Sequence, residues 1–153
     1  MIQGRFYWYR RRLPHWRLSG ATYFVTWRLH RQQMDLEPFE RTLVEEALRH
    51  FDAVRYQLFG YVVMNDHVHV LLSLLGDHEL AGILHSWKSF TAHELRKISG
   101  RSAPVWQDEA HDRIVRDERE QRIKLNYILN NPRRRWPSIE RYPWMWTIGQ
   151  SWP

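Results

Sequence analysis

The amino-acid sequence predicts an α+β fold, with helices packed on an antiparallel sheet, and three observations lead to this class. Residues 21–29 alternate with the two-residue period of a strand. Two apolar runs are separated only by Asn65 and Asp66, which is typical of a hairpin. Longer stretches before and after that hairpin place apolar residues at helical spacing instead.

The first strand is expected over residues 21–29 and the first helix over residues 38–54. Alternation divides the strand into two faces, with Tyr23, Val25, Trp27 and Leu29 on one and Thr22, Phe24, Thr26 and Arg28 on the other. Pro38 suits the first turn of the helix. The apolar stripe of this helix is expected to repeat every fourth residue, at Phe39, Leu43, Ala47 and Phe51.

The hairpin is expected to join strands over residues 56–64 and 67–73, because Asn and Asp tolerate the left-handed conformations of a tight turn. A second helix is expected over residues 79–98, with Asp77 as its N-cap and Gly100 as its stop. Its apolar face consists of Leu80, Ile83, Leu84, Trp87, Thr91, Leu95 and Ile98.

Residues 105–107 and 113–115 are interpreted as one short, interrupted strand. The element order then matches a ferredoxin-like βαββαβ unit. Two helices would cover one face of the antiparallel sheet, and the other face would remain for a site or for an added C-terminal helix.

That last helix is expected to begin near Glu118, because Asp117 and Glu120 have the spacing of a capping box. It is expected to end by Asn131, since the following proline disfavours helical geometry. Tyr127 precedes Asn131 by four residues, so the two side chains share one face of the helix.

Length, charge and composition restrict the function classes. The 153 residues suit one domain, residues 1–153, and the net charge of +6 favours a polyanionic partner, either nucleic acid or an acidic membrane. The absence of cysteine excludes disulfides, a Cys-ligated zinc site and a thiol nucleophile. Without a membrane-length apolar run or a signal-peptide core, we expect a cytoplasmic protein with no membrane partner. No Gly-rich phosphate loop occurs, so no nucleotide cofactor is expected.

Basic residues are densest in an extended N-terminal arm, residues 5–17, and in a Trp-rich tail, residues 133–153. The DNA-binding candidates are Arg10, Arg11, Arg12, Trp16, Lys88, Arg133, Arg134 and Arg135. Interleaved aromatic residues favour single strands, because phosphate neutralisation and base stacking then act together. Solubility and core packing are the alternative explanations of these arginines and tryptophans.

His67 and His69 are separated by one residue in a strand, so both imidazoles leave the same face and can converge on one divalent ion. The phenol of Tyr127 can attack a phosphodiester and form a phosphotyrosine. Two imidazoles and an amide would hold Mg²⁺ or Mn²⁺. Taken singly, each pattern is more common for structural reasons. Asp66 could orient an imidazole or simply serve the turn.

Five segments resemble, in order, the single-tyrosine HUH transposases and, within them, the REP-associated tyrosine transposases. These segments are residues 20–26, 61–72, 87–91, 106–118 and 127–132, with Tyr142-Pro143-Trp144 downstream. The resemblance implies that Tyr127 is the nucleophile and that His67, His69 and Asn131 are metal ligands. The sequence departs from the family pattern after Pro132, where it reads Arg133-Arg134-Arg135-Trp136-Pro137.

The resemblance implies a metal-dependent enzyme that nicks and joins single-stranded or hairpin DNA through a 5′-phosphotyrosine, in DNA transposition or REP-element mobilisation. It favours a monomer, although relatives also form homodimers. Two alternatives stay open: a non-catalytic nucleic-acid-binding domain of the same fold, and a metal phosphoesterase that uses water while Tyr127 is structural.

Overall fold

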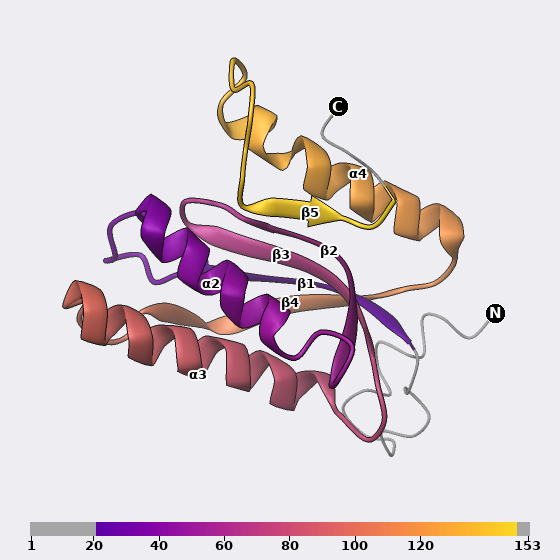
Figure 1. Cartoon of the computed structure of the whole chain (residues 1–153), viewed down its shortest axis with the longest axis horizontal. Helices are drawn as coiled ribbons and strands as arrows, with labels where there is room; N and C mark the ends of the chain where they lie inside the picture. Colours follow the sequence, from indigo (N-terminus) through magenta and orange to yellow (C-terminus); the bar gives the residue numbers. More distant parts are fainter. Residues whose placement is uncertain (1–20, 150–153) are drawn as a thin grey trace.

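A five-stranded antiparallel sheet of order β4-β1-β3-β2-β5 forms the centre of the computed structural model, which describes residues 21–149. Its strands are β1 (Thr22–Leu29), β2 (Tyr56–Val63), β3 (His67–Leu74), β4 (Trp106–Val115) and β5 (Met145–Thr147). The helices are α2 (Pro38–His50), α3 (Leu80–Ser99) and α4 (Glu118–Arg135). Helices α2 and α3 lie on one side of the sheet and α4 on the other (Figure 1), which confirms the ferredoxin-like prediction.

The two faces of the sheet bury separate cores. Tyr23, Val25 and Trp27 of β1 pack in the larger core beneath α2 and α3, while Phe24 packs in a second core with Leu125 of α4. The predicted alternation of the first strand is therefore confirmed. Among residues 21–149, no helix combines the length and the apolar character that a membrane span requires.

The hairpin prediction is confirmed, because β2 and β3 pair up to Val63 and Val68 across the Asn65-Asp66 turn. The amide of Met64 donates to the carbonyl of His67 at 2.8 Å. Neither turn residue has a positive φ, so the left-handed conformation expected there is not used.

Helix α2 is shorter than predicted, and its buried stripe lies elsewhere on the helix. The buried residues are Glu40, Val44, Ala47 and Leu48, and Phe39 is 55% exposed. The predicted stripe is therefore confirmed in part: Leu43, Ala47 and Phe51 pack against the core, but Phe39 does not, and the most buried face includes Glu40, whose carboxylate has a partner in Arg101.

Helix α3 largely agrees with expectation. Gly100 ends the helix in the left-handed region, at φ 68°. Asp77 is not the N-cap, since that position belongs to Glu79, whose side chain makes no capping bond. Ile98 was expected on the buried face but is 55% exposed.

Strand β4 is one continuous strand of ten residues, not the interrupted strand that was predicted. It pairs with β1 alone and forms an edge of the sheet, so most of its central residues stay solvated. Polar residues are tolerated at such an edge, and the apolar alternation that would have marked the strand is therefore absent.

Helix α4 continues through Pro132 to Arg135, so the predicted end at Asn131 was wrong. Asn131 and Pro132 are both buried, and the amide of Trp136 donates to the carbonyl of Pro132 at 2.7 Å. An interior proline costs about 3 kcal/mol in a helix. Burial of Asn131 and Pro132 offsets that cost, while Arg134 and Arg135 of the same turn stay exposed.

Strand β5 was not predicted and extends the sheet beyond β2, where it pairs with residues 60–62. Gly60 allows this close packing. A Cβ atom there would lie 3.1 Å from the Cδ2 atom of Leu125 and 3.1 Å from the Cγ2 atom of Thr147. The tail thereby completes the edge opposite β4.

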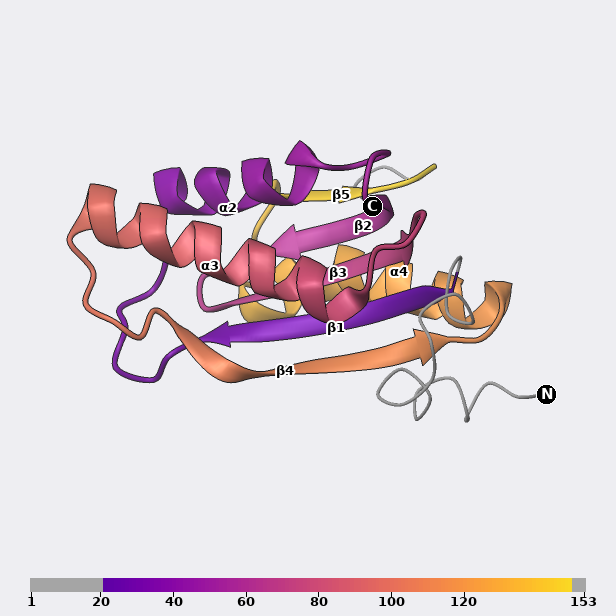
Figure 2. The same ribbon diagram turned by 90° about the horizontal axis from the view of Figure 1, so that it is seen from below.

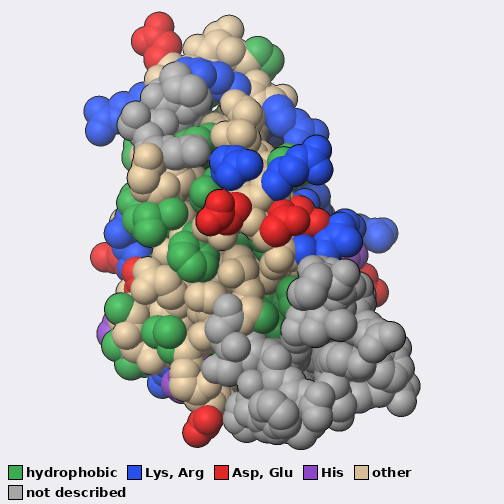
Figure 3. Space-filling model, turned by 90° about the vertical axis from the view of Figure 1, so that its right-hand side faces the viewer, with side chains coloured by type: hydrophobic (Ala, Val, Ile, Leu, Met, Phe, Trp, Pro, Cys, Tyr) green, Lys and Arg blue, Asp and Glu red, His purple; other side chains and the backbone are tan. Residues whose placement is uncertain are grey.

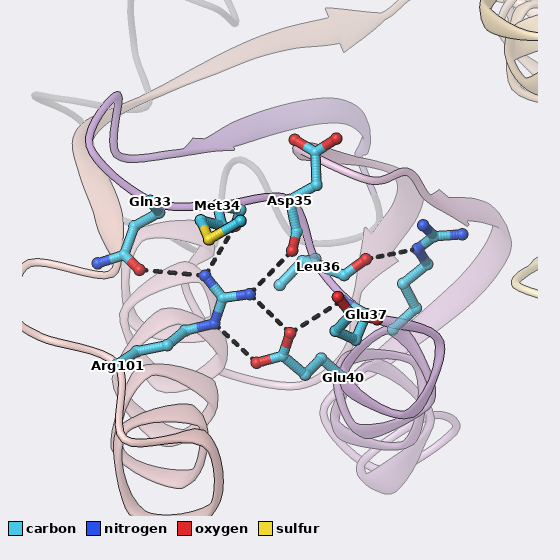
Figure 4. A network of polar contacts seen from close by, with 8 residues as sticks. Gln33, Met34, Asp35, Leu36, Glu37, Glu40 and Arg101 are labelled. Carbon is cyan, nitrogen blue, oxygen red and sulfur yellow. Dashed lines mark hydrogen bonds and ion pairs between the residues drawn. The ribbon is translucent and has the colours of Figure 1, made fainter.

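A buried ion pair fixes the connection between β1 and α2 (Figure 4). The guanidinium of Arg101 contacts the carboxylate of Glu40 at 2.6 Å and donates to the carbonyls of Met34 and Asp35. Burial by itself raises the pKa of Glu40, but hydrogen bonds from Arg101 and from the Glu37 amide bring it below its ordinary value.

The same connection braces the turn that precedes β3. The amide of Leu36 donates to the carbonyl of Asn65 at 2.7 Å, and the side-chain amide of Asn65 donates to the carboxylate of Asp35 at 2.9 Å. The Arg101–Glu40 pair therefore supports the hairpin turn from which the two histidines of β3 begin.

Replacing Arg101 with alanine is expected to destabilise the fold by about 3–5 kcal/mol, because the Glu40 carboxylate is 1% exposed and would be left without its counter-charge. The free energy of urea unfolding measures this loss. Because the folded pKa of Glu40 is lowered, the contribution of the pair is complete at neutral pH and is lost as pH falls through that pKa.

The double variant Glu40→Gln with Arg101→Met is the matched control, because it removes both charges together. We expect it to be more stable than Arg101→Ala. Equal instability of the two variants would mean that packing of the arginine side chain, not the buried charge, is what matters.

Candidate active site

His67 and His69 lie on the face of the sheet that α4 covers. Val68, between the two histidines, and Val70, directly after His69, point into the core beneath α2 and α3, as strand alternation requires. The two imidazole rings are 4.7 Å apart between centroids, at an angle of 77°. Two ring nitrogens can therefore approach a common point on this face.

His67 is held between the hairpin turn and α4. Its Nδ1 atom lies 2.7 Å from the carboxylate of Asp66, and its Nε2 atom lies 3.2 Å from Oδ1 of Asn131. The hydrogen bond to His67 lowers the pKa of Asp66 below its ordinary value, despite partial burial. A proton on Nδ1 would be donated to Asp66, and Nε2 would then present a lone pair toward Asn131.

His69 is buried and held by Thr26 of β1, its cross-strand neighbour. The Thr26 hydroxyl lies 2.6 Å from Nδ1, while Nε2 is buried with no hydrogen-bond partner. Burial, followed by repulsion from His67 and nearby cations, lowers the pKa of His69 to about 3. The ring is therefore neutral at pH 7 and can serve as a ligand through Nε2.

Tyr127 stands at the rim of the same site. Its ring centroid is 5.2 Å from that of His69, and the side chain is 37% exposed. The guanidinium carbon of Arg134 lies 5.0 Å from the Tyr127 ring centroid. The phenol ring is thus fixed beside the histidines, yet solvent and a substrate can reach it.

The residues present fit a divalent ion. Nε2 of His69 is buried without a hydrogen-bond partner, and a cation would supply one. Nε2 of His67 and Oδ1 of Asn131 would face each other with lone pairs, and a cation between them would satisfy both atoms. Two adjacent ligands on an octahedral ion lie about 3 Å apart, close to the spacing of that pair. Within residues 21–149 no three His, Cys, Asp or Glu side chains converge, so a ligand set here needs the Asn131 amide.

Thr26 and Phe24 are site residues that sequence reasoning did not single out. The Phe24 ring stacks on His69, with centroids 5.3 Å apart. Both residues were assigned to the same face of the first strand, but only the pairing of β1 with β3 shows that this face meets the histidines. Strand order is a property of the fold that local alternation does not contain.

The predicted DNA-binding residues are dispersed. Lys88 lies on α3, and its ammonium already donates to the carbonyls of Gln107 and Asp108. Arg133, Arg134 and Arg135 form the last turn of α4. Lys and Arg side chains also gather on the upper part of the face in Figure 3. Arg10, Arg11, Arg12 and Trp16, with the arm at 5–17, lie outside the described residues.

Comparison with known proteins gives a family and a similar fold. The family described as "Transposase IS200 like" matches residues 19–131. A REP-associated tyrosine transposase bound to a REP hairpin has a similar fold, with 20% identity, a TM-score of 0.69, and coverage of 83% of this chain and 76% of that one. A protein of Deinococcus radiodurans R1 assigned as a transposase is similar over 72% of this chain and 90% of its own, with 19% identity and a TM-score of 0.55. No curated protein matches the sequence.

Proposed function

Because the chain belongs to the IS200-like transposase family, we propose that it nicks and rejoins single-stranded DNA with Tyr127 as nucleophile. The observation that carries this proposal is the convergence of four residues from two distant elements. His67 and His69 come from β3, Tyr127 and Asn131 come from α4, and the ring of Tyr127 lies 5.2 Å from that of His69.

The phenol oxygen of Tyr127 would attack a phosphodiester, forming a bond from tyrosine to phosphorus as the bond to the 3′ oxygen breaks. The phenol loses its proton and the departing 3′ oxygen gains one, so a free 3′ hydroxyl and a 5′-phosphotyrosine result. Attack by a 3′ hydroxyl on that phosphotyrosine reverses the step and joins strands. No nucleotide cofactor is needed, because the phosphotyrosine conserves the bond energy.

His67, His69 and Asn131 are the residues that would hold Mg²⁺ or Mn²⁺. Such an ion would polarise the phosphate oxygens and stabilise the charge that develops on them. Asp66 and Thr26 would fix the orientation of the two imidazoles through their Nδ1 atoms. The ring of Tyr127 lies 5.2 Å from that of His69 within the same chain, which supports Tyr127 acting in its own site.

The similarity in fold to a transposase bound to a REP hairpin suggests the DNA for the first test. The protein is incubated with labelled single-stranded hairpin oligonucleotides and Mn²⁺ or Mg²⁺, then denatured and separated on a gel. A metal-dependent covalent protein–DNA band supports the proposal. Metal binding without any such band, over a broad set of hairpins, favours a nucleic-acid-binding domain.

Thr26→Val is expected to weaken Mn²⁺ binding by about 10–100-fold, because the hydroxyl that orients His69 is lost while the side-chain shape is kept. Thr26→Ser keeps the hydroxyl and is expected to retain most of the affinity. Titration calorimetry of the DNA-free protein with Mn²⁺ measures both. Equal affinities of the valine and serine variants would show that the 2.6 Å contact between Thr26 and His69 has no positioning role.

A further inference from the structure

Helix α4 covers only half of its face of the sheet. Its contacts are mainly with β2, β3 and β5, where Val62, Met64 and Leu71 form the core beneath it. The other half of that face belongs to β1 and β4, the pair at the opposite edge of the sheet (Figure 2). Tyr127 and His69 lie at the boundary between the two halves.

Apart from Phe24 and Val115, which pack in the core beneath α4, the β1–β4 half of this face is polar. Strand pairing places His111 beside Thr26 and Arg113 beside Phe24, so these side chains share one face of the sheet. Arg28 lies on the same face at the end of β1. Arg28, His111 and Arg113 are exposed. Within residues 21–149, α4 makes its main contacts elsewhere on this face, and a surface of this composition is suited to a charged ligand rather than to an apolar partner.

Two cations lie beside the candidate site. Arg28 of β1 and Lys124 of α4 line the same hollow as His69 and Tyr127. The ammonium of Lys124 lies 4.9 Å from the ring centroid of Phe24. Positively charged side chains therefore lie between the β1–β4 half of the sheet and the candidate active site.

One hollow of about 1680 Å³ is lined both by residues beneath α3, such as Leu84 and Trp106, and by these residues and the site on the face of α4. Its lining includes Tyr127, His69, Arg28, Lys124, His111 and Arg113. Glu109 also lines it and Asp66 lies near Arg28, but the Asp66 carboxylate is bonded to His67. Arg28 of β1, Arg113 of β4 and Lys124 of α4 are therefore three cations that line this hollow on the side of Tyr127.

We propose that Arg28 of β1, Arg113 of β4 and Lys124 of α4, here named the cationic strip, bind phosphates of a single DNA strand and lead it to Tyr127. This inference rests on the proposed function and adds the path of the substrate. The strand would cross β4 and β1 on the face bearing the histidines. None of these three residues is among the DNA-binding candidates predicted from the sequence, which include Arg133, Arg134 and Arg135.

The test is the salt dependence of binding to a fluorescein-labelled oligodeoxythymidine, measured by anisotropy in EDTA so that no cleavage occurs. Each phosphate contact with a single strand contributes about 0.7 to the slope of log affinity against log salt. Arg28→Ala, Arg113→Ala and Lys124→Ala are each expected to reduce the slope by about that amount and to weaken binding several-fold at low salt.

Lys97→Ala is the matched control, because Lys97 is exposed on α3, on the other side of the sheet. It is expected to leave the slope unchanged. The proposed path would be overturned if the strip variants had the same salt slope as Lys97→Ala. It would also be overturned if the slope fell only in Arg133→Ala, Arg134→Ala and Arg135→Ala. Absence of binding by the unaltered protein at low salt would overturn it too.

The outcome is separable from that of the proposed function. The adduct is measured with the unaltered protein, hairpin DNA and metal, whereas the salt slope is measured with the variants in EDTA. If the strip variants keep the salt slope of the unaltered protein, and the unaltered protein forms a normal adduct, the path alone is rejected. A normal strip effect with no adduct from the unaltered protein would reject the enzyme and leave a DNA-binding surface.

Discussion

Replacing Tyr127 with phenylalanine is expected to abolish the covalent adduct while the fold and the affinity for DNA are retained. The ring contacts with His69 and Arg134 do not involve the hydroxyl, so phenylalanine can keep them. Only the attacking oxygen is removed. Strand cleavage should fall by on the order of 10⁴-fold or more, the scale on which loss of an enzyme nucleophile is felt.

Denaturing gels with labelled hairpin DNA measure the adduct, and anisotropy measures binding. Tyr61→Phe is the matched control, because it removes the same atom from a buried tyrosine in the core beneath α2 and α3, where the hydroxyl contacts Glu45 and Arg49. It should form a normal adduct. Cleavage that persists in Tyr127→Phe would instead identify a phosphoesterase that uses water, with Tyr127 in a structural role.

Replacing His69 with alanine is expected to remove both metal binding and cleavage. Loss of a residue that merely orients a ligand costs about 10–100-fold in metal affinity, and loss of a ligand should cost at least the upper end of that range. His69 is also 3% exposed and stacked on Phe24. A moderate loss of stability is therefore expected from the cavity as well.

Titration calorimetry with Mn²⁺ on the DNA-free protein separates the two effects, provided that circular dichroism shows the variant to be folded. His69→Gln, which fills more of the space, is a second variant for this purpose. His93→Ala, at an exposed position of α3, is the control and should bind Mn²⁺ normally. Unchanged Mn²⁺ affinity in both His69 variants would disprove the proposed ligand set.

Local patterns were sufficient for the elements that alternate or repeat clearly. The period of β1, the hairpin around Asn65 and Asp66, and the left-handed stop at Gly100 follow from neighbouring residues, because backbone geometry and side-chain direction are local properties. Spacing also placed His67 with His69, and Tyr127 with Asn131, on common faces of their elements.

Local patterns failed where a distant partner changed the balance. Glu40 is buried because Arg101, sixty-one residues away, neutralises it, and this moves the buried face of α2. Pro132 stays helical because it is buried together with Asn131. The edge strand β4 keeps polar residues because it pairs only with β1. Strand β5 was not predicted, because three residues are too few to show an alternating pattern and their pairing with residues 60–62 of β2 is a contact between distant segments.

The sequence by itself determined the α+β class from residue type and short-range spacing, and the resemblance of five segments to a known family indicated the candidate nucleophile and the candidate ligands. Only the tertiary structure decided that Thr26 holds His69, that Asp66 holds His67, and that α4 leaves β1 and β4 open beside Tyr127. The reason is physical: strand order, register and the docking of α4 are set by packing between segments far apart in the chain, and no local period encodes them.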